Sequence, residues 1–273
     1  MALQPVMTQA MRVLRGRAEG LDLEKLVPVA RTLLEREPRT FTELRASLQE
    51  EFPHVNERAL GYAVRTQLPL VMVPTSDRWA FRSVADFTLA ETWLDAPIAD
   101  GAAPEALVLR YLAAFGPATA ADVQTWSGLT GIGGVLKALR PRLRVFRDER
   151  GRDLFDLPAA PRPHEDVVAP PRFLPEFDNL VLSHADRTRV LADEHRGLVV
   201  TRTLRVRATF LVDGLVAGTW EVKRTRDAAR LRLAPFQALP RRAVGELAEE
   251  GEALLRFAEA DADTLHVEVV ERP

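Results

Sequence analysis

The stretch Pro38-Arg-Thr-Phe-Thr-Glu-Leu44 occurs twice in this chain as the same pattern of residue types. The second copy, Pro117-Ala-Thr-Ala-Ala-Asp-Val123, matches the first position for position at an offset of 79 residues. In the first copy, Thr40 is followed three residues later by Glu43, which is the capping-box pattern that begins a helix. An internal repeat of this kind predicts two structural units of the same type.

The sequence around the first copy predicts three helices and a hairpin. The expected helices cover residues 23–37, 41–51 and 57–67, the last of them capped by Asn56, and the hairpin pairs residues 70–73 with 78–81. This order is typical of a winged helix, so residues 22–82 are predicted as winged helix A. An amphipathic helix is expected within residues 1–21, and its apolar stripe needs a surface to cover it.

The sequence around the second copy predicts the same order. Its expected elements are a lead helix at 104–115, a short third helix at 132–139 and a hairpin that pairs 143–147 with 152–157. Residues 104–157 are therefore predicted as winged helix B, and residues 83–103 as a connector between the two units.

A proline-rich linker at 158–171 separates these units from a different kind of domain at 172–273. Asp213-Gly214 predicts a tight turn that pairs Val212 with Leu215 and places Arg207 opposite Trp220. The rest of this domain is predicted to contain a third strand near 230–233, a helix from Pro240 and a closing strand near 265–269. The predicted fold class is α+β, with two tandem winged-helix domains followed by a small, mostly antiparallel or barrel-like α+β domain.

The composition excludes several function classes. The chain of 273 residues has no cysteine, so it has no disulfide, no thiolate nucleophile and no zinc finger of the usual kind. Its five histidines lack metal-ligand spacing, and neither a metal nor a cofactor is expected. No apolar run approaches the roughly 18 residues of a membrane span, so a cytoplasmic protein is expected. The net charge is −2, yet all but three of the 37 basic residues are arginines.

Polar residues gather in one stretch at the start of the last domain. They are Glu176, Asp178, Asn179, Ser183, His184, Asp186, Arg187 and Arg189, interleaved with an apolar run at 180–182 of buried-strand length. The cluster is either a structural network of caps and ion pairs or a functional site. The structural interpretation is favoured. It predicts that Asp178 and Asp186 are mostly buried, with Arg187 or Arg189 among their partners.

The amino-acid sequence of this stretch resembles that of a known family. Leu174-Pro-Glu-Phe-Asp-Asn-Leu180, followed by Ser183-His-Ala-Asp-Arg187, is similar to the signature of the winged helix DNA-binding domain-containing proteins, the AlkZ/YcaQ-like DNA glycosylases. Phe210-Leu-Val-Asp-Gly-Leu-Val-Ala-Gly-Thr-Trp220 resembles the second signature of that family. The resemblance runs from about Ala2 to the end of the chain. Family members usually carry a further winged-helix unit before the point where this chain begins.

The resemblance implies DNA glycosylase activity, but it assigns no catalytic residue here. In the family, a Gln-x-Gln or Gln-x-Asp motif in the preceding winged helix has the catalytic role. None of the six glutamines of this chain has that spacing, so whether the chain is an enzyme stays open. Asp178, Asp186 and His184 are the remaining candidates for acid–base chemistry.

Double-stranded DNA is the expected partner, because basic residues follow the third helices and the hairpins. The predicted contacts are Arg58, Tyr62, Arg65 and Arg78 in the first unit, and Lys137, Arg140, Arg144, Arg147, Arg150 and Arg152 in the second. Two alternatives remain. The native protein is an active glycosylase if its N-terminus is longer, or the winged helices are protein-interaction modules.

Overall fold

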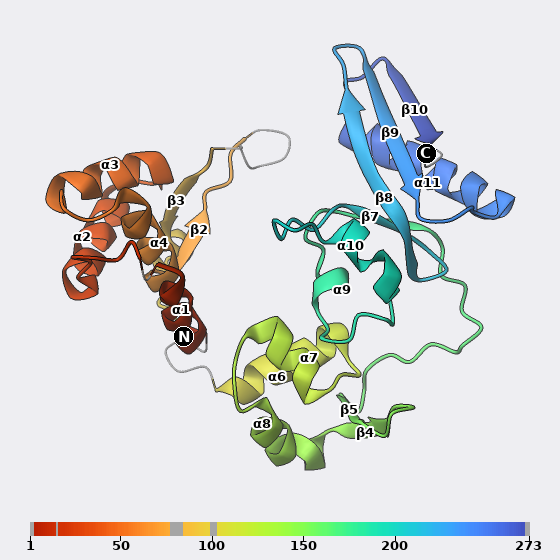
Figure 1. Cartoon of the computed structure of the whole chain (residues 1–273), viewed down its shortest axis with the longest axis horizontal. Helices are drawn as coiled ribbons and strands as arrows, with labels where there is room; N and C mark the ends of the chain where they lie inside the picture. The colour runs from red at the N-terminus through yellow and green to blue at the C-terminus, as the bar shows by residue number, and fades with distance from the viewer. Residues whose placement is uncertain (1–2, 15, 77–83, 99–102, 271–273) are drawn as a thin grey trace. The chain divides into compact units, whose positions relative to one another are not determined.

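The computed structural model describes residues 3–14, 16–76, 84–98 and 103–270. The chain divides into two compact units, residues 1–107 with 128–130, and residues 108–127 with 131–273. Both contain helices and strands (Figure 1), which confirms the predicted α+β class.

The first unit combines helices with a small sheet. Its elements are α1 Gln4–Ala10, η1 Met11–Leu14, α2 Leu23–Arg36, β1 Arg39–Thr40, α3 Phe41–Glu51, α4 Glu57–Gln67, β2 Leu70–Met72, β3 Asp86–Leu89 and α5 Ala90–Leu94. The Thr40 side chain accepts a hydrogen bond from Glu43 N and the Glu43 carboxylate accepts one from Thr40 N, so the predicted capping box at the start of α3 is confirmed. Asn56 caps α4 as predicted.

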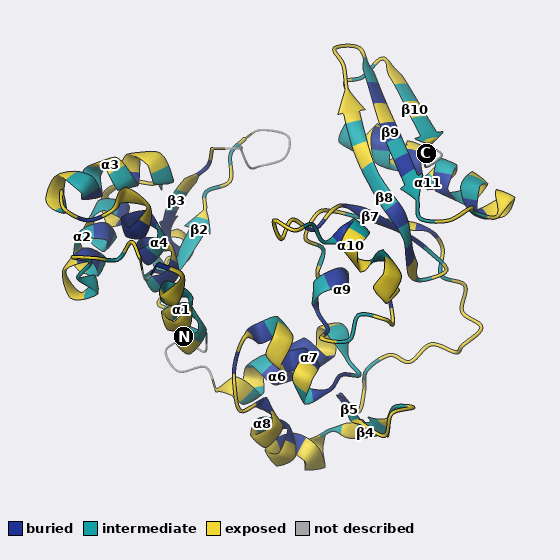
Figure 2. Cartoon of the chain, viewed as in Figure 1, coloured by how far each residue is buried: buried dark blue, intermediate teal, exposed yellow. Residues whose placement is uncertain are grey.

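Helix α4 lies at the centre of this unit and has the largest share of buried residues among its helices (Figure 2). Leu60 and Val64 on α4 pack with Leu26, Leu44 and other leucines of α2 and α3 in one apolar core. The N-terminal helices also lie on α4. The Tyr62 hydroxyl donates to Ala10 O at 3.3 Å, and Leu14 is buried in the same core. Helix α4 is therefore the cover that the N-terminal apolar stripe needs.

In the first unit, the strand that follows α4 pairs with a strand further along the chain. β2 pairs antiparallel with β3, in the register Leu70↔Leu89 to Met72↔Phe87. The strand predicted at 78–81 and the predicted contact Arg78 lie outside the described residues. Leu89 and Thr88 are both buried, so β3 contributes to the core, and the predicted connector 83–103 contains a strand and a short helix.

The second unit begins with a helical part that ends in a hairpin. Its elements are α6 Pro104–Phe115, α7 Ala120–Ser127, α8 Ile132–Leu139, η2 Arg140–Arg142, β4 Arg144–Arg147 and β5 Asp153–Asp156. The boundary between the two units falls within α6, so that the second unit includes this helix from Val108 onward. The predicted helices at 104–115 and 132–139 are confirmed. β4 and β5 pair antiparallel, with Arg144 opposite Asp156 and Arg147 opposite Asp153, which confirms the second predicted hairpin.

A five-stranded sheet forms the rest of this unit. Its elements are β6 Arg172–Leu174, α9 Asn179–Leu182, η3 Asp193–His195, α10 Arg196–Val199, β7 Thr209–Val212, β8 Leu215–Arg224, β9 Ala228–Pro235, α11 Arg241–Ala258 and β10 Thr264–Val269. The strand order is β10-β9-β8-β7-β6, and only β10 runs parallel to its neighbour. Within the described residues the sheet is open, with β10 and β6 at its edges, so the barrel-like closure is wrong. Helix α11 covers one face, where Leu247 and Leu255 pack against Leu231 and Leu233 (Figure 1).

The turn between β7 and β8 forms as predicted, but the register beyond it shifts. Asp213 and Gly214 have φ values of 51° and 76°, and Val212 pairs with Leu215. A β-bulge between Phe210 and Leu211 then moves the pairing by one residue. Ala208 O consequently accepts from Trp220 N at 3.1 Å. The predicted placement of Arg207 opposite Trp220 is wrong for this reason.

Gly218 in β8 is the position where this sheet tolerates no side chain. A Cβ there would overlap the ring of Phe210 and lie 2.6 Å from Ala234 O. We expect Gly218→Ala to lower the free energy of unfolding by about 1–3 kcal/mol, the usual effect of overpacking. Gly245 in α11 is the control, because a Cβ meets nothing within 4 Å there. Gly245→Ala is expected to stabilise by about 0.5–1 kcal/mol. Denaturant unfolding measures both, and a neutral Gly218→Ala would contradict the packing.

Candidate functional site

The carboxylate of Asp122 joins the helical part of the second unit to the polar stretch 176–189. Its Oδ2 accepts from Thr119 N and Thr119 Oγ1, both at 2.8 Å, and this caps α7. Its Oδ1 accepts from Ala185 N at 2.9 Å and Asp186 N at 3.5 Å. Burial acts to raise the pKa of Asp122, but these donors outweigh it, and the pKa lies below its ordinary value. The sequence repeat indicated the cap, and no sequence signal indicated the second set of contacts.

His184 is buried next to this carboxylate, between α6 and the polar stretch. Its Nδ1 lies 2.9 Å from Ser183 Oγ, and its Nε2 lies 3.0 Å from Phe115 O. Burial and the charge of Arg189 lower the pKa of His184. The imidazole is therefore neutral near pH 7. Its Nε2 lies near both the Phe115 carbonyl oxygen and Arg189 Nη1, which is 3.2 Å away. A histidine enclosed in this way anchors the stretch and has no open path to a substrate.

Asp186 links the same stretch to the β4–β5 hairpin. Its Oδ2 accepts from Arg150 Nη1 and Arg152 Nη2, each at 3.1 Å, while Thr188 donates to its Oδ1. Donors of Thr188, with Arg152 and Arg150, lower the pKa of Asp186 to about 2. The side chain is 23% exposed. Asp186 is mostly buried, as predicted. The prediction of Arg187 or Arg189 as its partner is wrong, because Arg150 and Arg152 bind it and Arg189 instead donates to Pro117 O at 3.0 Å.

The remaining signature residues are distributed over separate places. Asp178 is partly buried and caps α9 by accepting from Leu180 N at 2.7 Å, so its partner is a backbone N–H rather than the predicted Arg187 or Arg189. Asn179 begins this short helix, and the apolar run at 180–182 is a helical turn rather than a strand. Glu176 is exposed and pairs with Arg205. Arg187 is half-buried, which lowers its pKa. The signature residues thus form several contacts and no single catalytic cluster.

The basic residues of α8 and the β4–β5 hairpin differ in exposure and in whether they form ion pairs with acidic residues. Arg140 and Arg147 lie 2.8 Å and 3.6 Å from carboxylate oxygens of Asp153. Arg152 is paired twice, with Asp148 and Asp186. Lys137 and Arg144 are exposed and form no ion pair within the described ranges, and the guanidinium of Arg144 lies 4.9 Å from the Phe146 ring centre. Arg147 is 73% exposed.

In the first unit, the three predicted contact residues line one groove. The groove has a volume of about 300 Å³ and is lined by Phe41, Arg45, Arg58, Gly61, Tyr62 and Arg65. Arg65 lies 4.1 Å above the Phe41 ring, and Arg45 pairs with Glu57 at 3.2 Å. Arg58 is exposed on the first turn of α4. The predicted shared face of Arg58, Tyr62 and Arg65 is thereby observed.

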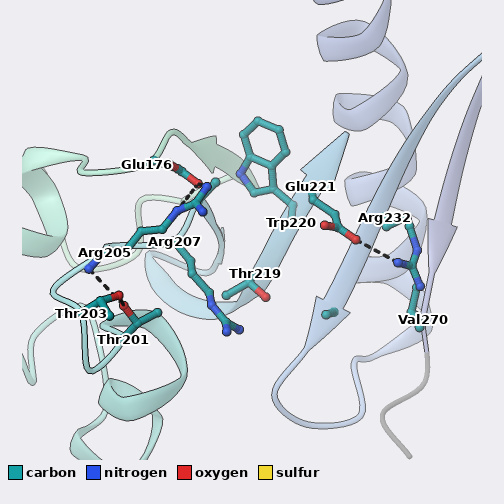
Figure 3. A pocket seen from close by; sticks show the side chains of 12 residues that line it. Glu176, Thr201, Thr203, Arg205, Arg207, Thr219, Trp220, Glu221, Arg232 and Val270 are labelled. Carbon is teal, nitrogen blue, oxygen red and sulfur yellow. Dashed lines mark hydrogen bonds and ion pairs between the residues drawn. The ribbon is translucent and has the colours of Figure 1, made fainter. Parts of the chain in front are cut away.

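A larger cleft, which the sequence did not indicate, lies on the sheet of the second unit (Figure 3). It has a volume of about 640 Å³ and is lined by Glu176, Thr201, Thr203, Arg205, Arg207, Ala208, Thr219, Trp220, Glu221, Arg232, Ala234 and Val270. The indole of Trp220 points away from the other labelled side chains, and its Nε1 donates to Leu174 O and Thr209 O.

Neither a metal centre nor a membrane span is found in the part of the chain that the structure describes. Residues 3–14, 16–76, 84–98 and 103–270 contain no group of three or more His, Asp or Glu side chains that could hold a metal ion. Their helices are too short or too polar to cross a bilayer.

Comparison with known proteins relates most of the chain to one family. A family model described as DNA glycosylase AlkZ-like matches residues 1–257. The interstrand DNA cross-link repair glycosylase of Streptomyces sahachiroi is 29% identical over 143 residues, which are 48% of this chain and 37% of that protein. The solved structure of Streptomyces sahachiroi DNA glycosylase AlkZ has a TM-score of 0.68 and 22% identity, covering 91% of this chain and 69% of that chain. The sequence match takes in little more than a third of the curated relative.

Because the pKa of His184 is lowered in the folded protein from the ordinary value of 6.5, the unfolded chain takes up the proton first. The stabilisation is complete above pH 6.5 and is lost as the pH falls through the folded pKa. We therefore expect the free energy of unfolding to decrease between about pH 7.5 and pH 5.5. His184→Gln should flatten this profile, whereas His164→Gln, at a histidine 74% exposed, should not. Denaturant titrations at several pH values give the comparison, and equal profiles for His184→Gln and wild type would contradict it.

Proposed function

Since the chain belongs to the AlkZ-like DNA glycosylase family, we propose that it binds duplex DNA and acts in DNA repair as part of a glycosylase of that family. The basic surface formed by α8 and the β4–β5 hairpin carries this proposal. Lys137, Arg144 and Arg147 are exposed there, and the first two have no acidic partner within the described residues. Cations of this kind bind phosphate oxygens of DNA without reading its sequence.

The proposal includes two winged helices. In the first unit α2, α3 and α4 precede β2–β3, and in the second α6, α7 and α8 precede β4–β5. The same capping box begins α3 and α7, which supports one type of unit in both places. In this arrangement α4 and α8 are the helices that face the major groove, and the β4–β5 hairpin lies along the backbone.

The ion pairs divide the predicted contacts into two roles. Arg150 and Arg152 bind Asp186, and Arg140 binds Asp153, so contact with phosphate would compete with these carboxylates. We infer that these three arginines mainly position the hairpin. Lys137, Arg144 and Arg147, together with the Arg58, Tyr62 and Arg65 face of α4, contact the DNA.

We further infer that the residues of this chain do not themselves release a base. A glycosylase needs a carboxylate or carboxamide that stabilises an oxocarbenium-like centre or positions water. Neither Gln-x-Gln nor Gln-x-Asp occurs in the 273 residues. Of the other candidates, Asp178 caps α9, Asp186 is neutralised by two arginines, and His184 is buried and neutral.

The protein is expected to bind a lesion-free duplex with little sequence preference, and log affinity should fall linearly with log salt concentration. Replacing Lys137, Arg144 and Arg147 together by alanine removes up to three phosphate contacts. The salt slope should then decrease by about 2–3, at about 0.9 per contact, and affinity at low salt should fall at least about tenfold. Fluorescence anisotropy at several salt concentrations measures both quantities.

A triple alanine variant of Arg241, Arg242 and Arg256 on α11 is the matched control, because it removes the same charge from an exposed helix. It should leave the slope unchanged. Equal slopes for the two triple variants would remove the α8 and hairpin surface from the interface. Weak binding with little salt dependence would instead favour a protein-interaction module.

For catalysis, we expect the purified 273-residue protein to release no N-alkylated base from duplex DNA under single-turnover conditions. The measurement is chromatographic detection of free base, with a glycosylase active on the same duplex as positive control. Release above the protein-free background would contradict the inference. Asp178→Asn, Asp186→Asn and His184→Gln would then identify the residue responsible.

A further inference from the structure

The cleft in Figure 3 lies on the face of the five-stranded sheet opposite α11. Paired residues of β8 and β9 alternate between the two faces. Trp220 and Leu233 belong to the core with α11, while Glu221 and Arg232 lie on the other face. The segment around α9 and α10 packs on part of that second face through Leu211 and Val216. The cleft therefore lies at the edge of this packing, where the loop 201–205 meets the open part of the sheet.

Among the charged side chains that line the cleft, Arg207 is the arginine without an acidic partner in the described residues. Arg205 donates to Glu176 through Nε at 3.1 Å and Nη2 at 2.5 Å. Arg232 is held between Glu221 at 2.8 Å and Glu268 at 2.7 Å. Arg207 is exposed, and no described residue accepts a hydrogen bond from its guanidinium or pairs with it. The positive charge of Arg207 is therefore available to an anionic ligand.

Threonine hydroxyl groups line the same cleft as Arg207. Thr219 and Thr201 line the cleft, and Thr201 Oγ1 lies 3.0 Å from Thr203 Oγ1. Thr209 is the cross-strand partner of Thr219, so the two side chains lie on the same face. The Thr209 hydroxyl is completely buried and has no hydrogen-bond partner. Hydroxyl donors beside an arginine are the groups that bind phosphate oxygens.

The cleft offers no aromatic surface on which a base could stack. Trp220 is its only aromatic lining residue among those described, and the indole is turned away and bonded to two backbone carbonyls. Single-stranded bases bind mainly by stacking on such rings. The chemistry of the cleft therefore favours the sugar-phosphate backbone over an unstacked base.

We propose that this cleft binds a phosphodiester of the DNA backbone, with Arg207 as the charged donor and the hydroxyl groups of Thr219 and Thr201 as further donors. The site adds a second anchoring point to the α8 and hairpin surface, within the same compact unit. This inference rests on the proposed DNA-binding function and extends it to a surface for which the sequence predicted no contact.

The test compares Arg207→Ala, Arg207→Lys and Arg242→Ala by fluorescence anisotropy with a fluorescent 24-base-pair duplex at several salt concentrations, a length chosen as about two helical turns. Arg207→Ala should weaken binding about tenfold, equivalent to about 1.4 kcal/mol, and should lower the salt slope by about 0.9. Arg207→Lys keeps the charge and should retain the slope. Arg242→Ala, on the opposite side of the sheet, should match wild type. Melting temperatures of all variants report on folding.

The outcomes separate the two proposals. If wild type binds DNA with a steep salt slope and Arg207→Ala has the same slope and affinity, the cleft proposal is overturned and the DNA-binding proposal stands. If Arg207→Ala and Arg242→Ala weaken binding equally, the effect is one of net charge, and the cleft proposal is again overturned. If wild type binds no DNA, both proposals fail.

Discussion

The second unit depends on one buried carboxylate. Removing Asp122 from water carries a large free-energy cost, which is offset only when both of its oxygens receive hydrogen bonds. Thr119 supplies donors to one oxygen and the backbone of Ala185 and Asp186 supplies donors to the other. The cap of α7 and the position of the polar stretch are therefore a single arrangement. Once Ala185 is placed, His184 reaches Phe115 O and Arg189 reaches Pro117 O, so three adjacent contacts hold the stretch to the α6–α7 region.

Asp186 extends this arrangement to the basic hairpin. With a pKa of about 2, it stays ionised throughout the physiological range and pairs with Arg150 and Arg152. Partly exposed ion pairs contribute little to stability individually, but two guanidinium groups on one carboxylate restrict the orientation of the β4–β5 hairpin. The acidic residues of the hairpin act similarly, because Asp153 lies between Arg140 and Arg147. Lys137 and Arg144 remain exposed without an acidic partner among the described residues, and Arg147 is 73% exposed although it lies near Asp153.

Features that depend on neighbouring residues were predictable from the sequence, and features that depend on distant contacts were not. The caps at Thr40 and Asn56, the hairpin at 144–156 and the turn at Asp213-Gly214 all follow from local hydrogen bonds or backbone preferences. The pairing of β2 with β3 and the bulge beside Phe210 are set by burial in the core. For the site, residue types identified Asp178, His184 and Asp186 as noteworthy. Their partners are up to 69 positions away, and the cleft around Arg207 combines five segments.

The signature stretch is best understood as a connection between two surfaces. At one end Glu176 holds Arg205 in the sheet cleft, and at the other Asp186 holds the hairpin, with the α9 turn capped by Asp178 between them. Both surfaces also carry an exposed arginine that has no acidic partner among the described residues. These are Arg207 in the cleft and Arg144 on the hairpin. Under the proposed function, both cations would bind phosphates of the DNA backbone. The dense polar chemistry of the stretch then positions the loop 201–205 and the β4–β5 hairpin.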